Sequence, residues 1–151
     1  MMYARQRGLT LVELMVVVAV MAIIASVAYP LYTAQVQKSR RADAKVALQS
    51  IALAQERVYT VNGGYSNNLN VLYPTSTVAI AAGFDHPFTS NTAGTTSRGY
   101  YTVGLTQTSN QDFGATASIA GAQASDADCV QFTINQLGVK GATDGGGTNC
   151  W

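Results

Sequence analysis

The chain begins with a long apolar run, which an amphipathic repeat follows. Between residues 9 and 29 the only polar side chains are Thr10, Glu13 and Ser26. These 21 residues, as a helix rising about 1.5 Å per residue, would span roughly 32 Å, close to the hydrocarbon thickness of a bilayer. The run therefore predicts a helix that needs lipid or other helices on all sides.

After Pro30 the apolar residues recur at three- and four-residue spacing, which predicts a continuing helix with one buried face. Proline removes the backbone bond to the Ser26 carbonyl, so a kink or local melting is predicted at Pro30. The helix should run from about Thr10 to Val61 and end at Asn62-Gly63-Gly64, where glycine can adopt a left-handed cap. The positions expected on the buried face are Ala44, Ala47, Leu48, Ile51, Ala54, Gln55 and Val58.

The second half of the chain predicts a small antiparallel sheet. Residues 65–99 are rich in proline and small polar residues, with an apolar patch at 78–84, and predict irregular structure with a short strand or helical turn. Apolar residues then alternate at 101–105, 113–119 and 130–134, and a shorter piece surrounds Val139. The predicted fold is α+β, with three to four antiparallel strands packed on one long N-terminal helix.

Charge gives little support for a nucleic-acid partner. Charged residues make up 11% of the chain, and without residues 1–8 seven basic and eight acidic residues leave a net charge of −1. No strong basic field is present. Arg98 and Lys140 could contact DNA phosphates, but two scattered cations are a weak footprint.

The two cysteines, Cys129 and Cys150, lie near the end of the chain. An even count in a translocated chain predicts one disulfide, and two reduced thiols are the alternative. The bond would close a C-terminal loop of about 22 residues and contribute about 3 kcal/mol on the chain-entropy estimate. Residues 141–149 have almost no apolar side chains, so this staple would have a clear physical purpose.

The sequence contains no catalytic constellation, so it predicts neither an enzyme nor a cofactor. His86, the only histidine, lies in a predicted turn and is not expected to be a ligand or a catalytic residue. Asp126 and Asp128 could offer carboxylates to Ca²⁺, but the EF-hand spacing is absent, and a solvated turn before Cys129 is favoured.

Tyrosines and hydroxyl residues have ordinary interpretations as well. Tyr65, Tyr100 and Tyr101 are expected to pack in the helix and sheet rather than to stack on nucleobases. The Ser/Thr-rich residues 89–97 could be glycosylated or adhesive, although a solvated loop is favoured.

The residues around the start of the apolar run carry a specific motif. Gly8-Leu9-Thr10-Leu11-Val12-Glu13 follows a short basic leader and resembles the prepilin peptidase site of type IV pilins and pseudopilins. The motif departs from the pattern of that family only at Leu9, where phenylalanine is most common in the family. A secretory signal peptide fits poorly, because the apolar run is long and no A-x-A site closes it. A plain membrane anchor leaves Glu13 unexplained, since a carboxylate in a membrane span is costly.

The resemblance implies several processing and assembly roles. The prepilin peptidase would cut between Gly8 and Leu9, and the new amine of Leu9 would be methylated. Glu13, with Thr10 nearby, would set the subunit register by pairing with the terminal amine of a neighbouring subunit. Physical chemistry independently supports a partner, since a lone carboxylate in an apolar helix is unstable until a positive group meets it.

Later segments resemble minor pilins of the PilE type, namely residues 39–44, residues 59–65 and the pattern Cys129, Leu137-Gly138, Lys140-Gly141. The implied organisation is a removed leader at 1–8, a transmembrane and fibre-core helix half at 9–30, and a periplasmic or extracellular globular domain at 31–151. Such a chain would cross the inner membrane once before assembly and lie in an extracellular pilus afterwards.

The implied function is that of a structural subunit, a minor pilin involved in type IV pilus assembly and hence in twitching motility, adhesion or DNA uptake. A type II secretion pseudopilin, a DNA-uptake or adhesin pilin that binds ligand through its loops, and a major pilin are the alternatives. The implied partners are other pilins through helix packing, the prepilin peptidase and the inner-membrane assembly platform.

Overall fold

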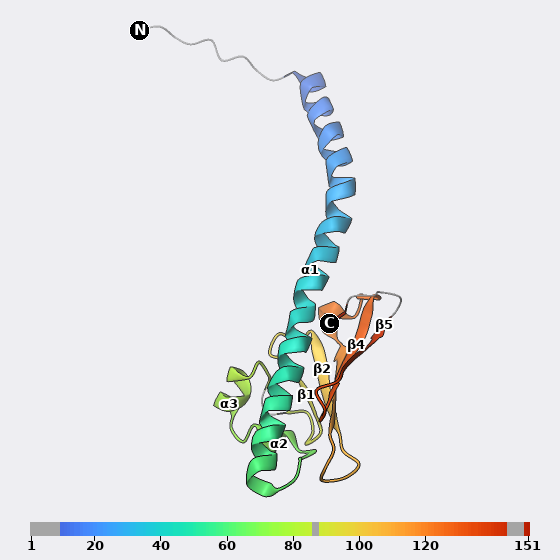
Figure 1. The fold of residues 1–151 in the computed structure, drawn as a ribbon. Helices are drawn as coiled ribbons and strands as arrows, with labels where there is room; N and C mark the ends of the chain where they lie inside the picture. Colours follow the sequence, from blue (N-terminus) through green and yellow to red (C-terminus); the bar gives the residue numbers. More distant parts are fainter. Residues whose placement is uncertain (1–9, 86–87, 145–149) are drawn as a thin grey trace, which may run out of the picture. The chain divides into compact units, whose positions relative to one another are not determined.

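A computed structural model of the chain describes residues 10–85, 88–144 and 150–151 (Figure 1). The chain divides into two compact units, Met1–Val36 and Gln37–Trp151. One long helix, α1 (Leu11–Asn62), belongs to both units. The second unit also contains α2 (Leu69–Leu72), α3 (Ser76–Ala81), the 3₁₀ turn η1 (Gly121–Gln123), and the strands β1 (Ala93–Thr95), β2 (Tyr101–Thr106), β3 (Gly114–Ile119), β4 (Cys129–Asn135) and β5 (Lys140–Asp144).

The first half of α1 begins with a capping arrangement. The backbone N–H of Glu13 donates to the Thr10 hydroxyl oxygen at 3.3 Å, and the Leu14 N–H donates to the Thr10 carbonyl. Thr10 and Glu13 have the spacing of a capping box, in which a hydroxyl satisfies one of the free amides at a helix start. The helix continues through Pro30, and the kink expected there stays a prediction.

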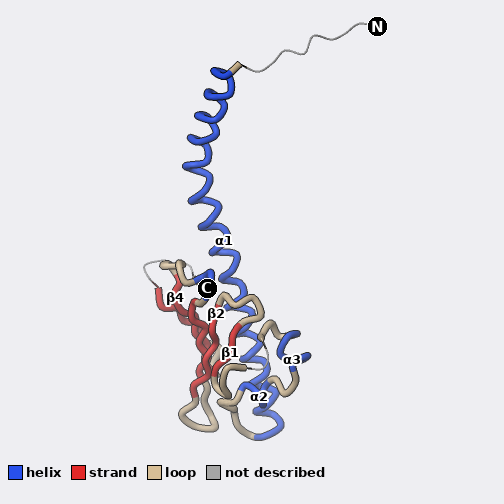
Figure 2. Tube along the Cα trace, turned by 180° about the vertical axis from the view of Figure 1, so that it is seen from behind, coloured by secondary structure: helices blue, strands red, loops and turns tan. Residues whose placement is uncertain are grey.

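The second half of α1 packs one face against the sheet, as predicted (Figure 2). Leu48 and Ile51 are fully buried and share a core with Tyr101, Val103 and Phe132. The alanines of the predicted face are also buried, and Val58 packs partly against the same core. This confirms the expected amphipathic face.

A glutamine is buried on this face, and both the nitrogen and the oxygen of its side-chain amide are hydrogen-bonded. Gln55 Nε2 donates to the Ser66 carbonyl, and the Ser66 N–H donates to Gln55 Oε1 at 3.0 Å. The chain therefore folds back against the helix directly after α1 ends. Gly63 has a φ of +72° and donates its N–H to the Tyr59 carbonyl at 2.8 Å, which confirms the predicted glycine cap.

The sheet is antiparallel, with the strand order β1-β2-β3-β4-β5. We expected three to four strands, but the sheet has one more, β1, which lies at one edge. This strand is three residues long and includes a glycine, so it carries no readable alternation, and pairing with β2 creates it. The fourth predicted piece is β5, which starts just after Val139 and pairs with β4 through a tight hairpin.

One predicted inward position was wrong. Val130 should face the core with Phe132 and Ile134, but its side chain is exposed, and Cys129 is buried instead. The register shifts between Cys129 and Gln131 where β4 pairs with β5. A bulge of this kind reverses which side chains point inward.

Cys129 and Cys150 form the predicted disulfide, which joins the start of β4 to the C-terminal end. Trp151 packs edge-on against Phe132 with ring centroids 5.8 Å apart, and its indole N–H donates to the Gly141 carbonyl. The long helix, the antiparallel sheet and the disulfide confirm the α+β fold.

We expect Ile51→Ala to lower the free energy of unfolding of the Gln37–Trp151 unit by about 2–5 kcal/mol, because it leaves a cavity under the sheet. Leu53→Ala is the matched control, since Leu53 lies on the same helix and is 69% exposed. It should change stability by no more than about 0.5 kcal/mol. Fluorescence of Trp151, the only tryptophan, reports unfolding in a urea titration. Equal losses for the two variants would contradict the assigned core face.

Candidate functional site

The first candidate site is the apolar segment of α1, defined here as residues 11–32. All of its side chains are exposed. In the described part of the chain it is the one stretch of helix long and apolar enough, by length and composition, to cross a membrane. An isolated helix that is apolar on all sides requires lipid or partner helices.

The polar groups of this segment differ in whether the helix itself provides their bonding partners. The Ser26 hydroxyl donates to the Ile23 carbonyl at 2.7 Å, and just beyond the segment the Thr33 hydroxyl donates to the Pro30 carbonyl at 2.9 Å. Both hydroxyls are therefore satisfied within the helix. Glu13 is the only charged residue between 10 and 37, and none of the ion pairs among the described residues includes it. Its carboxylate is the group that calls for a positive partner.

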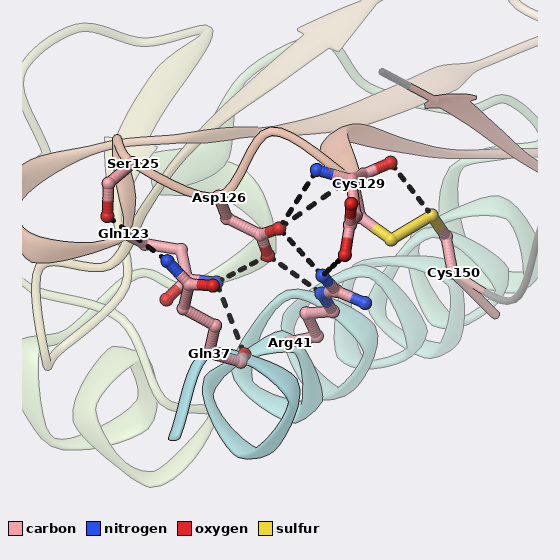
Figure 3. A network of polar contacts seen from close by, with 8 residues as sticks. Gln37, Arg41, Gln123, Ser125, Asp126, Cys129 and Cys150 are labelled. Atoms are coloured by element: carbon pink, nitrogen blue, oxygen red, sulfur yellow. Dashed lines mark hydrogen bonds and ion pairs between the residues drawn. A yellow bond between two sulfur atoms is a disulfide. The ribbon is translucent and has the colours of Figure 1, made fainter. Parts of the chain in front are cut away.

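The second candidate site is a polar clamp in the Gln37–Trp151 unit, made of Gln37, Arg41, Gln123, Asp126 and Asp128. Figure 3 shows the clamp around Asp126. Arg41 Nε donates to Asp126 Oδ2 at 2.7 Å, and Arg41 Nη2 donates to Asp126 Oδ1 at 2.6 Å. Arg41 Nη2 also reaches Asp128 Oδ2 at 3.2 Å. This bidentate geometry is the strong form of an arginine–carboxylate pair.

Asp126 is the centre of the clamp. Only 1% of its side chain is exposed, and it also accepts hydrogen bonds from Gln123 Nε2 at 2.7 Å and from the backbone N–H of Asp128 and Cys129. Burial raises the pKa of the Asp126 carboxyl, but the hydrogen bonds and charge of Arg41 outweigh it and hold that pKa below its ordinary value. The prediction of a solvated turn is therefore wrong for Asp126.

Further contacts tie the same loop to α1. Gln123 Nε2 donates to the Gln37 carbonyl at 3.2 Å, and Gln37 Nε2 donates to the Ser125 hydroxyl at 3.2 Å. Arg40 Nη1 donates to the Ala122 carbonyl at 3.1 Å, and its guanidinium lies over the Tyr100 ring. Because Cys129 follows directly, the clamp and the disulfide fix the beginning of β4 from two sides.

The clamp was missed by sequence reasoning. Arg41 and Asp126 are 85 positions apart, and no spacing rule connects them. The available signal was a basic pair at 40–41 on the turn before the buried helix face, together with two aspartates just before a buried cysteine. These carboxylates hold an arginine, and the described residues contain no group of three or more side chains suited to hold a metal ion.

The remaining predicted positions lie apart from the clamp or pack as expected. Tyr65 packs between Tyr59 and Phe113 with ring centroids 4.7 and 4.9 Å away, and Tyr101 is buried in the core, so the packing interpretation is confirmed for both. Tyr100 packs against the core and carries Arg40 over its ring.

The two candidate DNA-contacting cations have different neighbours. Arg98 pairs with Asp43 at 3.2 Å, and Lys140 lies over the Trp151 ring. Residues 89–97 include β1. Gly8, Leu9 and His86 lie outside the described residues.

Comparison with known proteins identifies the family. Residues 30–133 match the family described as "Type IV minor pilin ComP, DNA uptake sequence receptor", and residues 3–29 match the prokaryotic N-terminal methylation motif. Since the first match covers well over half of the chain, this protein belongs to that family of type IV pilins. Type IV pilins are non-enzymatic structural subunits, so the chain is a structural protein.

Two individual proteins are similar to the chain. The type IV major pilin protein PilA of Myxococcus xanthus (strain DK1622) is 36% identical over 66 residues, which is 44% of this chain. The aligned part spans only 30% of that protein's length. A type IV pilin structure from Shewanella oneidensis has 24% identity and a TM-score of 0.48, and the alignment covers 76% of this chain and 97% of that one.

We expect Arg41→Met to destabilise the Gln37–Trp151 unit by about 3–5 kcal/mol, because it leaves the buried Asp126 carboxylate without its charged partner. Methionine preserves much of the apolar stem, so the change isolates the charge. The matched control is Arg98→Met, which breaks a pair whose arginine side chain is 70% exposed and should cost much less, about 1 kcal/mol. Urea unfolding followed by Trp151 fluorescence measures both, and similar losses would argue against the clamp.

Wild type and Arg41→Met together also provide a test of pH dependence. Asp126 has a folded pKa below its ordinary value of 3.8, so its contribution is complete above about pH 4 and is lost as the pH falls through the folded pKa. Without Arg41 the buried Asp126 carboxyl should take up a proton more readily than in wild type, so the stability gap between wild type and Arg41→Met should narrow as the pH falls through the acid range. A gap that stays constant down to pH 2 would show that the Asp126 charge does not stabilise the fold.

Proposed function

We propose that this chain is a minor pilin, incorporated into a type IV pilus through the apolar segment of α1. The observation that carries the proposal is an exposed, largely apolar helix half with a single carboxylate near its start. The match to a minor-pilin family over residues 30–133 and to the methylation motif over residues 3–29 supports it.

The start of α1 is suited to processing and register. Cleavage between Gly8 and Leu9 by the prepilin peptidase would leave Leu9 as a methylated N-terminal residue, directly before the capping Thr10. Glu13 would then lie one helical turn from its own terminus and could meet the amine of the next subunit. One buried polar group can specify the register of packed helices, as it does in coiled coils.

The two halves of α1 would serve different surroundings. Before assembly, the apolar segment would hold the chain in the inner membrane, from which the assembly platform would extract it. In the fibre the same segment would pack against the helices of other pilins. The globular residues, held to α1 by the core face and the clamp, would lie on the outside and serve motility, adhesion or DNA uptake.

The prediction that tests this proposal is that Glu13→Gln reduces the amount of the chain in sheared surface fibres by at least about tenfold. The amide has the shape of the carboxylate but cannot pair with a positive amine, and such a pair in apolar surroundings is worth more than about 1.4 kcal/mol. Ser26→Ala is the matched control, since that hydroxyl is satisfied within its own helix. Immunoblots of fibre and membrane fractions provide the measurement.

Three outcomes are informative. Equal incorporation of Glu13→Gln and wild type would remove the register role. Complete absence of the wild-type chain from surface fibres would contradict the pilus assignment. If deleting the chain abolished protein secretion while pili remained normal, a type II secretion pseudopilin would be the better assignment.

DNA binding is a second candidate function, because the matching family is described as a DNA uptake sequence receptor. If the globular residues bind DNA, the association constant of the detergent-solubilised chain for duplex DNA should fall steeply with salt, with a log–log slope of about −0.9 per phosphate contact. Arg98→Ala and Lys140→Ala, measured separately, show whether either cation contributes a contact. Absence of binding at 50 mM salt would remove this candidate.

A further inference from the structure

Two tyrosines lie near the end of the apolar segment of α1. Tyr29 is 72% exposed and Tyr32 is 69% exposed. Their three-residue spacing puts both rings on the same side of the helix. None of the hydrogen bonds within the described part of the chain uses either hydroxyl group. Each side chain is therefore an apolar ring whose polar tip calls for a partner from outside the protein.

The other hydroxyls of this region are satisfied by the helix itself. Those of Ser26 and Thr33 donate to backbone carbonyls of the preceding turn. A short side chain can reach these carbonyls, whereas a tyrosine hydroxyl lies at the far end of its ring. Ser26 can therefore lie in hydrocarbon. Tyr29 and Tyr32 favour the boundary between hydrocarbon and water, where tyrosine is enriched in membrane helices.

A second polar group marks the other end of the segment. Glu13 lies nineteen positions before Tyr32, and between Glu13 and Tyr29 the one polar side chain is Ser26. At about 1.5 Å per residue, these nineteen positions span roughly 29 Å, and the hydrocarbon core of a bilayer is about 30 Å thick. The helix therefore has the length to place the Glu13 carboxylate at one face of a bilayer while the tyrosine hydroxyls reach the other.

These two ends together define one depth for the helix. A shift toward the carboxyl end of the chain would draw Glu13 into the hydrocarbon, where a charge is costly. A shift in the other direction would bury the tyrosine hydroxyls without hydrogen-bond partners. Residues 14–31 then cross the hydrocarbon, which refines the span of residues 9–30 that the sequence predicts.

We propose that lipid headgroups hold the apolar segment at both ends before assembly. Tyr29 and Tyr32 donate hydrogen bonds to phosphate and ester oxygens at the periplasmic face of the inner membrane, and the Glu13 carboxylate lies among the headgroups of the cytoplasmic face. This inference rests on the membrane-held stage of the proposed function, and it names the lipid contacts of that stage.

At this depth the Glu13 carboxylate is hydrated as long as the chain is held in the membrane. It leaves water only when the segment packs among the helices of other pilins, so the pair with a neighbouring amine forms at that step. The cost of burying the carboxylate then falls on assembly, and packing without a matching amine is disfavoured.

Fluorescence quenching by brominated lipids tests the depth. The full chain carries Trp151→Phe and one new tryptophan, and is reconstituted in vesicles of phosphatidylethanolamine and phosphatidylglycerol. Val18 lies five positions after Glu13, and Val27 lies five positions before Tyr32. Val18→Trp and Val27→Trp should therefore show the same ratio of quenching by lipids brominated near the headgroup and near the chain end. A displacement of one helical turn would separate their depths by about 11 Å, and such unequal ratios would overturn the proposed depth.

An exchange of two residues tests the carboxylate without changing the composition of the chain. With Glu13→Val and Val17→Glu, the carboxylate moves four positions inward, and its return to the headgroups should pull the helix along by about 6 Å. Val27→Trp should then become deeper by this amount, with stronger quenching from lipids brominated near the chain end. An unchanged depth would show that Glu13 does not anchor the segment.

Removal of the two hydroxyls tests the other end. Tyr29→Phe together with Tyr32→Phe lets both rings enter the hydrocarbon, so Val27→Trp should become deeper by about 3 Å, the rise of two residues. The matched control is Tyr59→Phe, which removes a hydroxyl from the Gln37–Trp151 unit and should leave the depth unchanged. Equal depths in the double variant and the control would overturn the tyrosine contacts.

The remaining outcomes separate these lipid contacts from the proposed function. If the chain is present in surface fibres but the Val18 and Val27 ratios differ, the depth is overturned while the pilus role stands. If the ratios are equal but the chain is absent from surface fibres, the pilus role fails and the lipid contacts stand. Release of the chain from the vesicles by an alkaline carbonate wash would overturn the membrane-held stage and the contacts with it.

Discussion

The globular unit depends on the burial of one face of α1 against the sheet. Small residues on that face, such as Ala44 and Ala47, let the sheet approach closely, and Leu48 and Ile51 fill the space between. Gln55 is a polar residue on this buried face. Its side-chain amide hydrogen-bonds to both the backbone carbonyl and the backbone N–H of Ser66. The strands, the clamp and the disulfide all take their positions from this packing.

Breaking the clamp is expected to cost more than the intact ion pair contributes to stability. A buried ion pair loses much of its attraction to desolvation, but removing one partner leaves a costly buried charge. Arg41 pairs with Asp126 in one conformation of the loop before β4. In this conformation Asp126 also accepts hydrogen bonds from the Gln123 amide and from two backbone N–H groups. The disulfide at Cys129 holds the neighbouring segment, so the C-terminal region has two independent restraints.

Several groups in a single copy of this chain lack a covering surface or a bonding partner. The apolar segment has no cover, Glu13 has no ion-pair partner among the described residues, and Asp43 Oδ2 has no donor there. The first two are unfavourable features for an isolated protein, because an exposed apolar helix needs lipid or partner helices and a lone carboxylate needs a positive partner. The proposed incorporation into a pilus would supply both.

The long helix, its buried face, its glycine cap, four of the five strands and the disulfide could be predicted from the sequence. Each of these depends on local periodicity, on backbone conformation or on a count of two cysteines. The strand β1, the outward orientation of the Val130 side chain and the ion-pair partner of Asp126 depend on the tertiary structure. β1 is too short to show a pattern, and the bulge at Val130 depends on the register with β5. The Arg41–Asp126 pair joins residues 85 positions apart, which only the packing of α1 on the sheet brings together.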